Sequence, residues 1–149
     1  MKKKQDILEG TMNYWKRKAN CARSTACGIL EYYGKNSLSD PFYKGMLPMG
    51  GGLGEGLVCG AVIGSLVATS LVLVESGLND EMTSKQIKKW KQEFIQKFES
   101  LNCFDLINEF RNAEGKVDLK MPGRREKCTE IVASAVTIAK QVIDFPTEQ

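Results

Sequence analysis

The fold of this chain is decided by the stretch GLVCGAVIGSLVATSLVLV, residues 56–74, which contains no charged side chain. Its length is close to the ~20 apolar residues that cross a bilayer, so a membrane span is one interpretation. The segment before it, MGGGLGE at 49–55, is rich in glycine, which is also typical of a phosphate-binding loop. The third interpretation is a buried helix at the centre of a soluble bundle.

The composition of the stretch favours the buried helix. Glycine, serine and threonine interrupt it, and neither aromatic nor basic residues flank its start, as they do in many membrane spans. The glycine-rich segment lacks the Gly-Lys-Ser/Thr ending of a phosphate loop and follows no strand pattern. We therefore expect no membrane span, and a buried helix over residues 57–76. Small residues at four-residue intervals would form a ridge where another helix can approach closely: Gly56, Gly60, Gly64 and Ala68.

The rest of the sequence shows helical periodicity, as in Ile87, Trp90 and Phe94, and no alternating strand pattern. It predicts an all-α fold: one domain over residues 1–149, a helical bundle around the central glycine-rich apolar helix. Thr83 or Ser84 is expected to cap the helix that contains Trp90. The other helices are expected at 6–18, 20–33, 84–101, 103–112 and 124–143, with a connection at 35–54 that holds a short helix near 41–44.

The charge of the chain is mild, with a formal net charge of +3 and 26% charged residues. Basic residues gather in MKKKQ, NYWKRKAN and SKQIKKWK, but no long basic face with interleaved aromatic residues emerges. We interpret these segments as solvated helix faces and expect no nucleic-acid partner. The start, MKKKQDILEG, has no apolar region after its positive cluster, so we expect no secretory signal and a cytoplasmic location.

The sequence contains no histidine, which is its most useful negative feature. Without histidine there can be no Cys₂His₂ zinc site, no Ser–His or Cys–His catalytic pair and no His-ligated haem. The five cysteines of a cytoplasmic protein are kept reduced, so they are better candidates for metal ligands or redox thiols than for structural disulfides.

The cysteines share one local setting. Four of the five are expected at a helix start, the last of them in the first turn of the final helix: Cys21, Cys59, Cys103 and Cys128. A helix N-terminus presents free N–H groups and a positive dipole end, which favour the thiolate that attacks disulfides and binds metals. Cys27 lies inside its predicted helix and is expected to be a packed core thiol outside the set, with its role left open.

No two of the cysteines form a CxxC motif, so zinc-ribbon, thioredoxin and ferredoxin signatures are absent. Only tertiary packing can assemble them. Gly51 and Gly52 would let the backbone pack tightly near Cys59 or supply N–H groups to sulfur. Gly60 and Gly64 would let a neighbouring helix come close enough for the sulfurs to meet.

Four segments together resemble the C-GCAxxG-C-C family of redox-active proteins: NCARS, GGGLGEGLVCGAVIGSL, LNCFDLI and REKCTEIVASAVTIAKQVI. The family core is matched by Cys59, Gly60, Ala61 and Gly64, and the resemblance covers roughly residues 14–143. It implies a small all-helical protein with a redox role, often encoded near transporter genes. It also implies that the site consists of Cys21, Cys59, Cys103 and Cys128; Cys27 matches no cysteine of the family.

Our leading hypothesis is therefore a redox module in which four thiolates surround an iron–sulfur cluster and exchange electrons with a redox partner protein, one associated with a transporter. All-sulfur ligation suits an iron–sulfur cluster or tetrahedral zinc. Two alternatives stay open, namely a metal-free thiol–disulfide protein and a structural zinc module. We also expect a homodimer, because the glycine ridge and a small cysteine-bearing surface favour self-packing.

Overall fold

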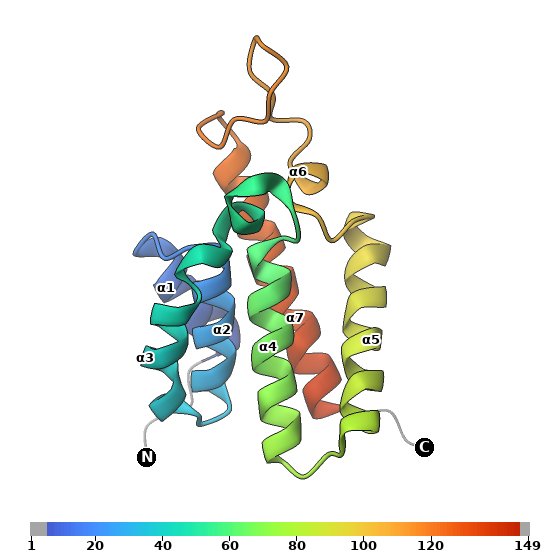
Figure 1. The fold of residues 1–149 in the computed structure, drawn as a ribbon. Helices are drawn as coiled ribbons and strands as arrows, with labels where there is room; N and C mark the ends of the chain where they lie inside the picture. Colours follow the sequence, from blue (N-terminus) through green and yellow to red (C-terminus); the bar gives the residue numbers. More distant parts are fainter. Residues whose placement is uncertain (1–5, 147–149) are drawn as a thin grey trace.

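The computed structural model describes residues 6–146, and the basic segment at residues 1–5 lies outside this range. The described chain is almost entirely helical (Figure 1), which confirms the predicted all-α class. Within it the only β-type pairings are two isolated bridges, Val58 with Asn102 and Arg111 with Val117. The elements in chain order are α1 (Ile7–Lys16), α2 (Cys21–Tyr32), α3 (Asn36–Gly45), η1 (Leu47–Met49), η2 (Gly52–Gly56), α4 (Gly60–Glu75), α5 (Asp80–Phe98), α6 (Cys103–Leu106) and α7 (Arg124–Asp144).

Helices α2, α4 and α7 pack against one another at the centre of the bundle. They run in the same direction, so their N-terminal ends lie at one end of the molecule, together with η1, η2 and α6 (Figure 1). Helices α1 and α3 pack on α2, and α5 packs on α4 and α7. Because these three helices run in the same direction, the residues at their N-terminal ends lie together at one end of the bundle.

Helix α4 is the central apolar helix, and Gly60 and Gly64 of the predicted ridge pack against α2, whereas Gly56 lies before α4 and faces the Phe104 ring. A Cβ atom on Gly64 would lie 2.4 Å from the carbonyl oxygen of Ala22 and 2.2 Å from Oγ1 of Thr25. The ridge therefore serves close packing of α2 on α4 and is not open to a second copy. No helix of the described residues is both long enough and apolar enough to cross a membrane.

Several predicted helix boundaries were wrong. Helix α4 begins at Gly60 rather than at residue 57, because the residues before it pair with the segment that leads into α6. Helix α5 begins at Asp80 rather than at residue 84, since Asn79 is the cap and its Oδ1 accepts a hydrogen bond from the Met82 N–H at 2.9 Å. Helix α6 ends at Leu106 instead of residue 112, and α7 extends by one residue to Asp144.

The connection at 35–54 is more helical than predicted, because α3 runs from Asn36 to Gly45 with Pro41 inside it. A proline in a helix interior removes one backbone hydrogen bond and is normally unfavourable. Leu38 and Phe42 of α3 pack against the core, and this burial offsets the loss.

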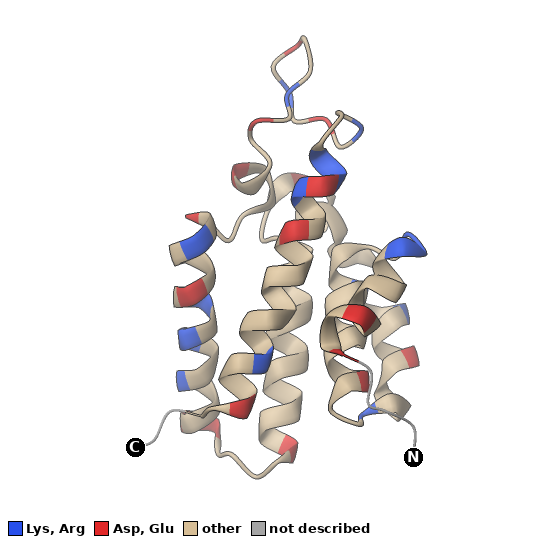
Figure 2. Cartoon of the chain, turned by 180° about the vertical axis from the view of Figure 1, so that it is seen from behind, with Lys and Arg blue, Asp and Glu red and all other residues tan. Residues whose placement is uncertain are grey.

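Charged side chains are concentrated on α5 and at the N-terminal end of α7, as Figure 2 shows from behind. Along α4 the only charged residue is the last one, Glu75, which pairs with Lys35 at 2.8 Å. The solvated helix faces expected from the sequence thus lie on the outside of the bundle, and the charge-free helix lies at its centre.

Candidate metal and redox centre

The end of the bundle where α2, α4, α6 and α7 begin contains a cavity of about 300 Å³. Four cysteines line it, each from a different segment: Cys21, Cys59, Cys103 and Cys128. All five cysteines are free thiols. Cys27 lies elsewhere, fully buried between α2 and α3, with its sulfur 3.4 Å from the carbonyl oxygen of Ser39. The structure thus brings the four predicted residues to one cavity and leaves Cys27 outside it.

Cys21 is held by the cap of α2. The side-chain oxygen of Asn20 accepts a hydrogen bond from the Arg23 N–H at 2.8 Å, which is the usual role of an asparagine at this position. The amide nitrogen of the same side chain donates to the carbonyl oxygen of Leu47 at 2.9 Å. Asn20 therefore fixes the start of α2, and Cys21 with it, against the turn that precedes α4.

Cys59 and Cys103 are placed side by side by the bridge between Val58 and Asn102. The Cys59 N–H donates to the carbonyl oxygen of Leu101 at 2.8 Å, and the Cys103 N–H donates to that of Leu57 at 2.6 Å. Each cysteine directly follows a bridge residue, and each then begins a helix. This short antiparallel pairing joins two cysteines that are far apart in sequence.

The glycines before Cys59 build a left-handed turn. Four successive residues at 51–54 have φ between 62° and 70°, a region that disfavours side chains, and three of them are glycine. The N–H of Gly51 donates a hydrogen bond to the sulfur of Cys21. Gly52 does not line the cavity; a Cβ atom there would lie 2.4 Å from the Leu57 nitrogen, so it is needed for the turn itself.

Glycine also sets the distance between α2 and α4 at the cavity. A Cβ atom on Gly60 would lie only 2.5 Å from the sulfur of Cys21. Because Gly60 has no side chain, the sulfur of Cys21 can occupy the space beside Cys59. Gly64 acts one turn further along α4, where it permits the same close approach of the two backbones.

Cys21 and Cys59 form a hydrogen-bonded pair with opposite pKa shifts. The Cys59 thiol donates to the Cys21 sulfur and lowers the pKa of Cys21 to about 7, helped by the N–H groups of Gly51, Ala22 and Ala61. The same hydrogen bond, together with burial, raises the pKa of Cys59 well above its usual value. Near neutral pH the metal-free pair therefore shares one proton, with the negative charge on Cys21.

The pKa values of the other two cysteines are raised in the metal-free protein. Burial, followed by the negative charges of Cys21 and Cys128, raises the pKa of Cys103 to about 12. Burial also raises the pKa of Cys128, although a hydrogen bond from Arg124 opposes the shift. The predicted first-turn position of Cys128 was wrong: α7 begins at Arg124, so Cys128 starts the second turn, where its own N–H bonds within the helix.

Cationic side chains at the cavity were missed by the sequence reasoning. Among residues 6–146, the charged residues that line it are Lys18, Arg124 and Arg125, and no aspartate or glutamate lines it. Arg125 stacks on the Trp15 ring, with its guanidinium carbon 3.9 Å from the ring centroid. Arg124 stands four residues before Cys128 on a helix, and this spacing was the available signal.

The four sulfurs share a cavity but not the ligand sphere of a single ion. Between residues 6 and 146, no group of three or more Cys, Asp or Glu side chains is arranged to hold one metal ion. Within the cavity, Cys21 and Cys59 are the two cysteines joined by a hydrogen bond.

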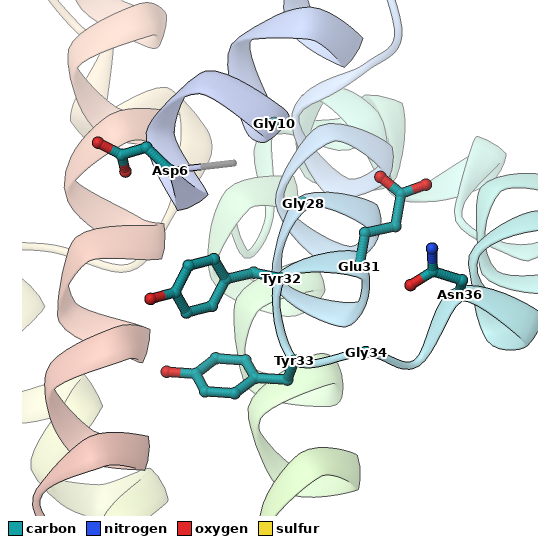
Figure 3. Close-up of a pocket in the computed structure, with 8 residues that line it drawn as sticks. All are labelled: Asp6, Gly10, Gly28, Glu31, Tyr32, Tyr33, Gly34 and Asn36. Atoms are coloured by element: carbon teal, nitrogen blue, oxygen red, sulfur yellow. The ribbon is translucent and has the colours of Figure 1, made fainter. Parts of the chain in front are cut away.

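A larger cavity of about 740 Å³ lies away from the four cavity cysteines (Figure 3). Its lining comes from the start of α1, the end of α2 and the start of α3, and includes Glu31 and Tyr32 but no cysteine. Cys21 and Tyr32 are at opposite ends of α2, about 17 Å apart at 1.5 Å per residue. This cavity is separate from the cysteine centre.

Comparison with known proteins identifies the chain. Residues 19–142 match the model of the family described as "Putative redox-active protein (C_GCAxxG_C_C)". The chain belongs to the C-GCAxxG-C-C family. The match confirms the resemblance carried by the four cysteine segments, and it begins just before Cys21 and ends well after Cys128. No curated protein and no solved structure matches this member of the C-GCAxxG-C-C family.

Proposed function

We propose that this C-GCAxxG-C-C protein transfers electrons and that its four cavity cysteines hold an iron–sulfur cluster. One observation carries the proposal: cysteines from four separate segments line one cavity, and no carboxylate of the described part of the chain takes part in it. Iron–sulfur clusters are held by cysteine thiolates, commonly four of them. The donor set of the cavity therefore fits such a cluster. The residues in question are Cys21, Cys59, Cys103 and Cys128.

The size of the site supports a cluster over a single zinc ion. Zinc binds thiolates at about 2.3 Å, so four sulfurs around one ion lie roughly 3.8 Å from one another. Among the described residues no such arrangement is found, and the four cysteines line a cavity of about 300 Å³. A centre with several metal atoms fills more of such a cavity than one ion does.

The charge and burial of the site support the same proposal. Four thiolates carry negative charge, and the cationic lining residues Lys18, Arg124 and Arg125 offset it. Cys59 and Cys103 are only 6% and 9% exposed, so the protein shields their sulfurs from water. A bound cluster supplies one-electron redox chemistry, while the chain holds the ligands, orients them and sets the electrostatic environment. The electron partner is proposed to be a separate redox protein associated with a transporter.

Anaerobic purification tests this proposal. The wild-type protein should be brown and contain iron and acid-labile sulfide, with an electron paramagnetic resonance signal in the reduced state. Serine in place of any one of the four cavity cysteines should lower the iron content, whereas Cys27→Ser, a matched control outside the cavity, should keep it. A colourless wild type that takes up no iron on anaerobic reconstitution would contradict the proposal.

A second candidate function is thiol–disulfide exchange, favoured by the hydrogen-bonded pair of Cys21 and Cys59. The Cys21 thiolate would attack one sulfur of a disulfide substrate and release the first thiolate. Cys59, after losing its proton, would then attack the Cys21 sulfur, forming the Cys21–Cys59 disulfide and releasing the second thiolate. The substrate gains the two electrons that the pair loses.

Mass spectrometry of the metal-free protein tests this second function. Treatment with a small disulfide should remove two hydrogens from the protein and link Cys21 to Cys59 in a peptide map. In the Cys59→Ser variant the substrate should remain attached to Cys21 as a mixed disulfide. If the pair stays reduced while the iron-loaded protein forms readily, the cluster is the supported function.

A further inference from the structure

We infer that Arg124 tunes the four-cysteine centre by donating a hydrogen bond to the sulfur of Cys128, so that loss of its guanidinium weakens metal binding and lowers the reduction potential. The inference rests on the proposed function in one respect, namely that the four sulfurs act together as one centre. It assigns Arg124 the role of a positioning residue, which acts through Cys128.

The position of Arg124 follows from α7. Arg124 is its first residue and lies four residues before Cys128, so the two side chains share one helix face, and both line the cavity. The Nε–H of Arg124 donates to the carbonyl oxygen of Leu119 at 2.7 Å. This bond anchors the guanidinium to the loop before α7 and leaves its other N–H groups available to the Cys128 sulfur.

The other cations of the cavity are placed differently. Arg125 packs over the Trp15 ring and donates to the Trp15 carbonyl oxygen, so its guanidinium is committed to α1. The field of Arg124 reaches a second sulfur, because its charge also favours the thiolate of Cys103. Arg124 is thus the cation that acts on two cysteines from two elements.

The direction of the effect follows from charge. Metal binding needs thiolates, and reduction adds a further negative charge, so a fixed positive charge stabilises both the loaded and the reduced states. Hydrogen bonds to the ligand sulfurs are among the features that set the potential of such centres. Replacing Arg124 with a neutral side chain should therefore lower both the metal affinity and the reduction potential of the centre.

The test uses the full-length wild type with Arg124→Gln, Arg124→Lys and, as a control, Arg111→Gln. Arg111 hydrogen-bonds to Asn108 and Gly115 in the loop before α7 and does not line the cavity. The metal-free proteins are titrated with Cd²⁺, whose binding to thiolates is followed by ultraviolet absorbance. Arg124→Gln should bind Cd²⁺ about tenfold more weakly, as expected for loss of a hydrogen bond to a charged group. Arg111→Gln should match the wild type.

The second measurement is the midpoint potential of the iron-loaded proteins. Arg124→Gln should shift the ratio of oxidised to reduced centre about tenfold at a given potential, which is 59 mV for a one-electron couple. Arg124→Lys keeps the charge but loses the fork of donors, so a loss of about threefold in Cd²⁺ affinity is expected. A merely structural role would lower the melting temperature without moving the potential.

Each outcome is decisive. Arg124→Gln that folds and equals the wild type in Cd²⁺ affinity and potential overturns this inference alone. If Arg124→Gln loses its helical circular dichroism, Arg124→Lys carries the test: weaker binding supports the inference, and binding equal to the wild type overturns it. A wild type that binds neither Cd²⁺ nor iron overturns the proposed four-sulfur centre and this inference with it.

Discussion

Gly64→Ala is the substitution that most directly tests how α4 holds the cysteine centre. The new Cβ atom would lie 2.4 Å from the carbonyl oxygen of Ala22, whereas ordinary contacts begin near 3.4 Å. The backbones of α2 and α4 must therefore separate by about 1 Å, because this backbone oxygen cannot rotate away.

The expected magnitude combines two opposing terms. Overpacking of this kind costs typically 1–3 kcal/mol, and the upper end applies because the obstacle is backbone. Replacing glycine by alanine in a helix interior gains about 1 kcal/mol of intrinsic helix propensity. The net loss in the free energy of unfolding is then about 2 kcal/mol, which corresponds to a melting temperature lower by roughly 4–8 °C for a chain of this size.

Thermal and urea unfolding followed by circular dichroism measures this loss. Gly45→Ala is the matched control, because Gly45 is the last residue of α3 and a Cβ atom there has nothing within 4 Å. That control should be as stable as the wild type or slightly more stable. If Gly64→Ala proves as stable as Gly45→Ala, the reasoning that α2 and α4 are in backbone contact at Gly64 is refuted.

Further predictions concern the cysteines and the association of the chain. In the metal-free protein, the rate of alkylation of Cys21 should rise with pH through about 7, and Cys59→Ala should move this rise to higher pH because the thiol that stabilises the thiolate is removed. Asn20→Ala should lower the free energy of unfolding by about 1 kcal/mol through loss of the helix cap, measured by urea unfolding; an unchanged midpoint would contradict the role of the cap. We also expect a homodimer, and because α2 covers Gly60 and Gly64, we propose the apolar groove beside Val67 and Val74 on α4 as its surface. Light scattering that gives a monomer mass at micromolar concentration would count against this expectation.

Only part of the centre was predictable from the sequence, and the errors have local physical causes. The cap of α5 could be any of several nearby polar residues, and Asn79 rather than Thr83 or Ser84 took the role. Cys128 was placed one turn too early relative to the helix start, so its expected free N–H environment is absent. Arg124 was not singled out at all. A charged residue on a helix is normally expected to face solvent, and its neighbours in space cannot be read from the sequence.

The sequence by itself determined the helical class, the central role of the apolar helix predicted at residues 57–76 and the membership in a four-cysteine family. The class and the central helix depend on local periodicity and on caps such as Asn20, which act within a few positions along the chain, and the family membership depends on a sequence motif that contains Gly60 and Gly64. Only the tertiary structure decided that α2, α4 and α7 run in the same direction and so bring their cysteines to one cavity. It also decided that Cys21 pairs with Cys59, because that contact depends on the backbone approach of two helices whose cysteines no short-range pattern connects.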